Sequence, residues 1–227
     1  MKSLFLPILA GATLRDRIIA CAAASIGIGL TAWLSALVVD ARTAALLVAP
    51  MGASAVLIFA VPTSPLAQPW PVIGGNVLSA LVGIAIARAV PNATLAAGLA
   101  VAGAILVMSL TRSLHPPGGA AALLPVLGGS SIVSMGYWFA VVPVGLNAAV
   151  LAALGLLLHR LTGHSYPHRA APAGGQTLPS VEMVPHPEDL DLALADLGET
   201  FDVSREDLDL LFERVEQHAV ERKSRAR

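Results

Sequence analysis

The sequence predicts an all-α polytopic membrane protein that carries a small cytoplasmic helical tail. Of its 227 residues, 56% are hydrophobic and only 13% are charged, which is far from the balance of an ordinary soluble domain. Isolated charges separate uncharged runs of 22, 45, 23 and 47 residues, and a bilayer core takes about 20 apolar residues per helix. The charge is also divided, with +6 on residues 1–181 and −7 on residues 182–227.

These counts disfavour soluble enzymes, disulfide-stabilised secreted domains and basic nucleic-acid binders. The single cysteine, Cys21, lies in an apolar run, where helix packing is the ordinary role. The six histidines lack metal-ligand spacing, and no Gly-x-Ser-x-Gly motif occurs. We therefore expect no enzyme activity, no metal, no cofactor and no nucleic-acid partner.

The first two uncharged runs predict three helices. Residues 18–39 follow a few basic residues, but the run is too long for a signal peptide and further spans follow at once, so we interpret it as a retained helix. The second run contains four prolines from Pro62 to Pro71, which divide it into helices at about 43–61 and 72–89. Trp70 beside these prolines suits a membrane interface.

The second half predicts one plain span and one interrupted run. Residues 93–111 form the plain span. The last run opens at His115 with the segment HPPGG, continues as a short element to about Leu127, and resumes after Gly128–Ser131 as a long helix at about 134–160. In all, we expect about six helical elements.

A self-comparison of the sequence indicates an internal repeat with halves at about 17–90 and 93–160. Pro50–Ile58 aligns with Pro116–Leu124 at a spacing of 66. The further matches, at spacings of 71 or 72, pair Gly74, Asn76, Gly83 and Arg88 with Gly145, Asn147, Gly155 and Arg160. Three elements per half, an odd number, predict an inverted 3+3 repeat.

The positive-inside rule favours six crossings over five. With six crossings and the N-terminus inside, only Arg42 and Arg88 fall outside, and the other six basic residues of the membrane region fall inside. With five crossings the same charges divide four and four. We therefore expect both termini to be cytoplasmic, and the bilayer to be a bacterial inner membrane.

Two short apolar segments begin at a proline with glycine beside it, at Pro50 and at Pro116/Pro117. A helix that starts inside a protein leaves free N–H groups and a partial positive charge, so two such starts predict an anion site. The alternative is that these residues only allow close helix packing. The predicted substrate-binding residues are Pro50, Gly52, Ser54, Asn76, Arg112, His115, Pro116, Pro117, Gly118, Gly119 and Asn147.

Several of these residues have two alternative roles. Arg112 either contacts substrate or extends to the lipid headgroups. Asn76 and Asn147 are paired by the repeat and serve either as interhelical hydrogen-bond formers or as site residues. His115 titrates near neutrality, so it is also a candidate for carrying a proton with an anion.

We divide the chain into a membrane domain at 1–165, a Pro/Gly/His-rich linker at 166–184 and an acidic tail at 185–227. The tail predicts one amphipathic helix at Pro187–Leu197, with an apolar face of Leu190, Ala193, Leu194 and Leu197. A second helix follows Ser204, which with Asp207 suggests a capping box, and its apolar face holds Leu208, Leu211, Phe212 and Val215. These faces pack on each other, on a cytoplasmic partner or on the membrane domain.

The ordered motifs of residues 17–165 resemble the HPP family of integral membrane proteins, named for His-Pro-Pro. They are APMGASAVLIFAVP at 49–62, SPLAQPW at 64–70, IGG at 73–75 and HPPGGA at 115–120. Met51 stands where members often carry Phe, and Asn76 where many carry His. The resemblance implies a helical membrane domain, usually described with four spans, and, for plastid and cyanobacterial members, nitrite transport.

In longer relatives a similar acidic connector leads into a pair of CBS domains, so this chain is either a fragment of such a protein or complete without that module. Taken together, we expect a membrane transporter or permease for a small anion such as nitrite, and we expect a homo-oligomer because the predicted bundle is thin and rich in Ala and Gly. The alternative, from another class, is a membrane-anchored sensor or regulatory scaffold that signals through its tail.

Overall fold

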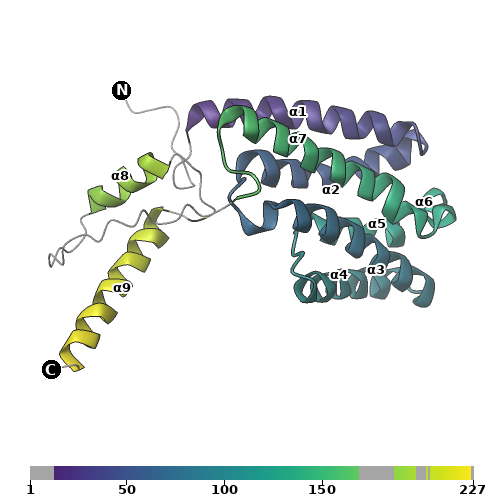
Figure 1. The fold of residues 1–227 in the computed structure, drawn as a ribbon. Helices are drawn as coiled ribbons and strands as arrows, with labels where there is room; N and C mark the ends of the chain where they lie inside the picture. Colours follow the sequence, from purple (N-terminus) through teal and green to yellow (C-terminus); the bar gives the residue numbers. More distant parts are fainter. Residues whose placement is uncertain (1–12, 169–186, 198–202, 204, 226–227) are drawn as a thin grey trace. The chain divides into compact units, whose positions relative to one another are not determined.

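The computed structural model describes residues 13–168, 187–197, 203 and 205–225, and every regular element among them is helical. Figure 1 shows the elements. The chain divides into two compact units, residues 16–168 and a second unit that includes the tail helices. The all-α polytopic fold class is therefore confirmed. The first unit is called the bundle below.

Five helices of the described chain are long and apolar enough to cross a membrane. They are α1 (Leu14–Ala36), α2 (Ala41–Ala60), α3 (Asn76–Ala89) with the π-helix η2 (Pro71–Gly75) before it, α4 (Ala93–Leu110), and α7 (Leu146–Thr162) with the π-helix η3 (Ala140–Gly145) before it. The shorter elements are η1 (Pro65–Ala67), α5 (Pro117–Leu127) and α6 (Ser130–Met135).

The start of α1 and the end of α7 lie at one end of the bundle, which we call the terminal end. There the Arg17 guanidinium donates to the carbonyl of Ala60, at the end of α2, at 2.7 Å. His164, just after α7, pairs with Asp16 of α1 at 3.9 Å. An even number of passages returns a chain to its starting side, so this placement agrees with six helical elements.

Other contacts show which residues lie at the opposite end of the bundle. Asp40, between α1 and α2, is hydrogen-bonded by Ser131 of α6. The guanidinium of Arg88, in the last turn of α3, lies 4.7 Å from the centre of the Tyr137 ring. Pro125 of α5 lines a small cavity together with Arg88. The 11 residues of α5, about 16 Å of helix, thus lead from the terminal end toward the opposite end.

Small side chains let α3, α4 and α5 pack closely. Ala80, Ala100, Ala104, Ala121 and Ala122 are all 0% exposed, and a Cβ atom at Gly83 of α3 would lie 2.2 Å from the Ala122 carbonyl oxygen of α5. Lipid chains are as apolar as leucine, so membrane helices associate through this kind of close contact. A second cluster joins α1, α2 and α7 around Ile58 and Leu151.

The predicted helix start at Pro50 is wrong, because Pro50 lies inside α2. The helix begins at Ala41 instead, where the Asp40 carboxylate accepts hydrogen bonds from the backbone N–H groups of Arg42 and Thr43 at 3.1 Å each. A proline inside a membrane helix removes one hydrogen bond but is tolerated there. Only one of the two predicted short segments, α5, is therefore a separate helix.

The last uncharged run also differs from the expectation, because its long helix begins later than about residue 134. Gly129 and Gly136 both have positive φ angles and flank α6, so the long final helix begins at Ala140 rather than at about 134. Glycine adopts such backbone at little cost. The break at 62–71 and the plain span at 93–111 are confirmed within two residues.

The tail unit contains α8 (Pro187–Leu197), with the predicted bounds, and α9 (Arg205–Arg225). Arg205 joins the two helices through its Nε atom, which lies 2.7 Å from Asp191. Leu194 is buried, whereas Leu211, Phe212 and Val215 of α9 are exposed. The predicted cap Ser204 and most of the predicted linker lie outside the described residues.

Candidate functional site

The loop between α4 and α5 turns sharply inward and carries His115 into the bundle. Arg112 adopts φ 53°, a left-handed conformation that is uncommon outside glycine. Ser113 then donates its backbone N–H back to Met108 at 2.8 Å. Ser113 and His115 are both 0% exposed. A non-helical segment at this place is compatible with a membrane protein because it is enclosed by protein.

His115 is the centre of a polar cluster built from three separate segments. Its Nε2 atom lies 2.8 Å from Ser54 Oγ of α2, and its Nδ1 atom lies 2.8 Å from the Leu66 carbonyl oxygen in η1. Asn76, at the start of α3, donates from Nδ2 to Ser54 Oγ at 3.3 Å and to the Val72 carbonyl at 2.8 Å. Three of the predicted residues, Ser54, Asn76 and His115, therefore lie together in the structure.

The partners of the ring determine its protonation. A carbonyl oxygen only accepts, so Nδ1 carries a hydrogen and donates it to Leu66. His115 lies in the loop between the spans, and burial lowers its pKa to about 4, against an opposing effect of the Leu66 hydrogen bond. At neutral pH the ring is therefore uncharged, and its Nε2 accepts the hydroxyl hydrogen of Ser54.

Two glycines bring α3 and α5 onto this cluster. A Cβ atom at Gly75 would lie 2.6 Å from the Ser113 carbonyl oxygen and 2.7 Å from the His115 Cβ. At Gly118 a Cβ would lie 2.7 Å from Ser79 Oγ and 2.9 Å from the Gly75 carbonyl oxygen. Side chains at either position would push α3 away from the start of α5. Gly118 was predicted from its motif, but Gly75 was not.

Two polar atoms of this region have no hydrogen-bond partner among the described residues. They are Asn76 Oδ1 and Ser79 Oγ, and both side chains are 0% exposed. Ser79 faces the first turn of α5, since it meets the place of a Gly118 Cβ. An unpaired buried polar group costs free energy. Ser79 was not predicted, because a single serine inside an apolar run gives no signal in the sequence.

The start of α5 differs from the open anion site that we expected. The backbone N–H of Gly118 donates to His115 at 2.8 Å, and that of Gly119 donates to Pro116 at 3.0 Å. Such i to i+3 bonds satisfy donors that a helix start otherwise leaves free, and Pro117 has no N–H. The positive end of the helix remains, but its first donors are already used.

The other predicted residues lie around or outside the cluster. The Pro50 carbonyl oxygen lies 3.1 Å from Ser54 Oγ. Asn147 belongs to a different pair, in which its Nδ2 donates to Ser35 Oγ of α1 at 2.7 Å. Arg112 is exposed at the terminal end. Cβ atoms at Gly52 and Gly119 would meet nothing within 4 Å, so these glycines are not needed for close contact.

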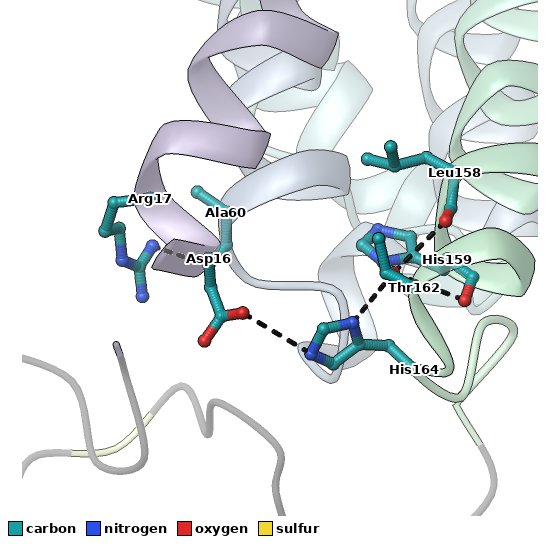
Figure 2. A network of polar contacts seen from close by, with 7 residues as sticks. All are labelled: Asp16, Arg17, Ala60, Leu158, His159, Thr162 and His164. Carbon is teal, nitrogen blue, oxygen red and sulfur yellow. Dashed lines mark hydrogen bonds and ion pairs between the residues drawn. The ribbon is translucent and has the colours of Figure 1, made fainter. Parts of the chain in front are cut away.

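A second polar network, which sequence reasoning missed, lies at the terminal end (Figure 2). His159 of α7 is 3% exposed, and its Nε2 donates to the Ile58 carbonyl at 2.8 Å. His164 lies 2.9 Å from Thr162 Oγ1 and 3.9 Å from Asp16. Tyr166 packs on His159. Within the described residues no group of three His, Cys, Asp or Glu side chains is arranged to hold a metal ion.

Tyr166 also ties this network to the cluster around His115. Its hydroxyl donates to the carbonyl of Ala67 at 2.8 Å, next to the Leu66 carbonyl that accepts from His115. The backbone N–H of His168 donates to Gln68 Oε1 at 2.8 Å. Trp70 donates its indole N–H to the Thr111 carbonyl at 3.0 Å. Three hydrogen bonds thus attach the segment from η1 to Trp70, which contacts the buried histidine, to neighbouring parts of the chain.

Comparisons with known proteins agree with this architecture. Residues 10–167 match the family described as "HPP, transmembrane region". A curated protein of Dictyostelium discoideum, named only as a transmembrane protein, is 41% identical over 126 residues, which are 53% of this chain and 44% of that protein. Another protein of the same organism, named in the same way, is 38% identical over 138 residues, 59% of this chain and 44% of its own length.

The match thus spans less than half the length of either relative. No solved structure matches the chain significantly.

Proposed function

Because this chain belongs to the HPP transmembrane family, we propose that it is a membrane permease for a small anion and that the cluster around His115 is its substrate site. One observation carries the proposal. Three polar side chains from distant parts of the sequence meet inside an apolar helical bundle. Polar and ionisable groups are costly within a membrane protein, and a functional role is the default interpretation.

The chemistry of the cluster fits a small oxyanion. A protonated His115 supplies a positive charge, the unpaired Ser79 hydroxyl is a hydrogen-bond donor, and the positive end of the α5 dipole adds a favourable field. Nitrite, a small oxyanion whose oxygens accept hydrogen bonds, is the first substrate to test. Of the predicted residues, His115, Ser54, Asn76 and Gly118 belong to this proposed site.

In this proposal the contacts around His115 belong to a closed state of the permease. Side chains and backbone fill the region around the ring, as the close approaches at Gly75 and Gly118 require. Passage therefore needs a movement, and we propose that it occurs in the segment from η1 to Trp70, which Trp70 and Tyr166 attach to neighbouring segments by hydrogen bonds. Loop movement of this kind is an ordinary step in transport and catalysis.

For orientation, we propose that the terminal end faces the cytoplasm of a bacterial cell. Arg17, Arg112 and Arg160 lie toward that end, whereas Arg42 and Arg88 lie toward the other. An inverted repeat gains support from a feature that the two halves share. In both, a π-helical segment precedes the helix that carries the paired asparagine, Asn76 or Asn147.

The test is uptake of nitrite into proteoliposomes that contain the purified chain, beside a panel of formate, nitrate and chloride. The wild type is compared with His115→Ala and with Ser109→Ala, whose hydroxyl is exposed on α4 and bonds only to its own helix. Saturable nitrite uptake that His115→Ala abolishes and Ser109→Ala retains supports the proposal. Absence of uptake for every anion in folded, oriented protein refutes it.

The exposed apolar face of α9 favours a second candidate, a membrane-anchored sensor or scaffold. Leu211, Phe212 and Val215 are exposed on a helix outside the bundle, and such a face suits a cytoplasmic partner. Deletion of residues 177–227 separates the two functions. A permease keeps its anion flux without this tail, whereas a scaffold loses its output.

A further inference from the structure

We propose that the cluster of Ser54, Asn76 and His115 binds one proton together with the transported anion, so that the permease is a proton–anion symporter. This inference rests on the proposed function and names its second substrate. It follows from the arrangement of hydrogen-bond donors and acceptors around a single hydroxyl group.

Ser54 Oγ has three polar neighbours and only one hydrogen to donate. The neighbours are His115 Nε2 at 2.8 Å, the Pro50 carbonyl oxygen at 3.1 Å and Asn76 Nδ2 at 3.3 Å. The amide Nδ2 donates to the hydroxyl oxygen. With a neutral ring, the hydroxyl hydrogen points to Nε2, and the Pro50 carbonyl is left without it.

Addition of a proton at Nε2 reverses one hydrogen bond and keeps the others. The new N–H donates to Ser54 Oγ, the hydroxyl rotates to donate to the Pro50 carbonyl, and the amide of Asn76 continues to donate. Nδ1 donates to Leu66 in both states. One N–H bond forms, none breaks, and the cluster gains one positive charge. Both states satisfy the ring and the hydroxyl without movement of a heavy atom.

The added charge has no built-in counterion among the groups that face the ring. A hydroxyl from α2 and a carbonyl from η1 contact the ring, and an amide from α3 contacts that hydroxyl; none of these groups titrates in the physiological range. The two acidic residues of the bundle are engaged elsewhere, Asp16 with His164 and Asp40 as the cap of α2. The ring therefore stays neutral until an anion arrives.

An anion supplies the missing negative charge, and the two ions then stabilise each other. A buried charge is strongly disfavoured alone and much less so when it is paired. The Ser79 hydroxyl, buried and without a partner among the described residues, provides a further donor at the first turn of α5. Binding of the proton and binding of the anion are thus coupled, which is the thermodynamic requirement for symport.

The experiment measures nitrite and protons together in proteoliposomes of the full chain, with a pH-sensitive dye inside. An inward nitrite gradient is applied without a pH gradient, and protein-free liposomes correct for passive entry of the protonated acid. We expect the lumen to acidify by about one proton per nitrite, because a single imidazole binds one proton. A non-titrating variant, His115→Gln, is expected to lose this acidification, and Ser109→Ala to retain it.

The outcomes separate the two proposals. Saturable nitrite uptake without acidification by the wild type overturns the symport inference and leaves the permease standing. Absence of uptake for every anion overturns both. Because His115→Gln also risks misfolding, nitrogen-15 NMR of the histidine rings in the wild type provides a second readout. Nitrite is expected to move His115 to the form protonated at both nitrogens, and a ring that stays neutral with nitrite bound contradicts the inference.

Discussion

Replacement of Gly83 by alanine tests a close backbone contact between α3 and α5. The new Cβ atom would lie 2.2 Å from the Ala122 carbonyl oxygen and 2.9 Å from its carbonyl carbon. Real Cβ contacts essentially never fall below 3.0 Å, so α3 and α5 must separate by about 0.8 Å. Both partners are backbone atoms, and neither can rotate away as a side chain does.

The cost follows from two opposing effects. Overpacking in a closely packed core costs about 1–3 kcal/mol, and the higher helix propensity of alanine returns up to about 1 kcal/mol. Because both contacting groups are backbone, the upper part of that cost, about 2–3 kcal/mol, applies. The net loss is then roughly 1–2 kcal/mol, which for a domain of this size lowers the apparent Tm by about 2–8 °C. The assay is thermal unfolding of the purified protein in one detergent, followed by loss of monodisperse protein.

Gly98→Ala is the matched control, because Gly98 is exposed on α4 and a Cβ there meets nothing within 4 Å. We expect it to melt at or slightly above the wild-type temperature. If Gly83→Ala also melts at or above the wild-type temperature, the backbone contact between α3 and α5 does not exist as described. The reasoning about small residues in this bundle then fails with it.

Three further predictions concern hydrogen bonds. Hydrogen bonds from Thr43 lower the pKa of Asp40 from 3.8 to about 2. The carboxylate therefore contributes fully to stability above about pH 4, and this contribution is lost as the pH falls through 2. The Tm of Asp40→Asn, whose side chain caps the helix without titrating, is expected to change less with acid pH than that of the wild type. Tyr166→Phe removes the buried bond to Ala67 and is expected to cost about 1 kcal/mol, seen as a Tm lowered by about 3 °C; an unchanged Tm contradicts this contact. Asn147→Ala breaks the bond to Ser35 of α1 and is expected to cost only about 0.6 kcal/mol, the average for membrane helices; a loss several times larger in the same melting assay points to a wider network.

The sequence predicts the helices that are delimited by strong local signals. The prolines between Pro62 and Pro71 break a helix wherever they occur, and an uncharged run such as 93–111 needs only its length to be recognised. The helix start at Pro50 was predicted wrongly because proline is common at a first helical position, yet the Asp40 carboxylate begins the helix nine residues earlier. The sequence held two signals for a helix start, Pro50 and Asp40, and the helix begins at the one whose side chain caps it by hydrogen bonds.

In the candidate site, too, some residues were predictable from the sequence and others were not. His115, Ser54 and Asn76 were predicted from motifs, and the structure brings them together. Ser79 and the Leu66 carbonyl were not predictable, because their roles depend on which helices meet at Gly75 and Gly118. A backbone carbonyl has no signature in a sequence, and the pairing of helices is a tertiary property. Asn147 has the same residue type as Asn76 but a different neighbour.

Because the Trp70 side chain is hydrogen-bonded to the loop that carries His115, its intrinsic fluorescence is a probe of that region. The chain has three tryptophans, and Trp33 near the end of α1 and Trp138 before η3 both lie toward the end opposite Trp70. The Trp70 indole is 54% exposed, and its N–H is bonded to Thr111 in the loop that carries His115 inward. In a Trp33→Phe, Trp138→Phe background, the emission maximum and quenching of Trp70 are expected to change if the segment that contacts His115 opens.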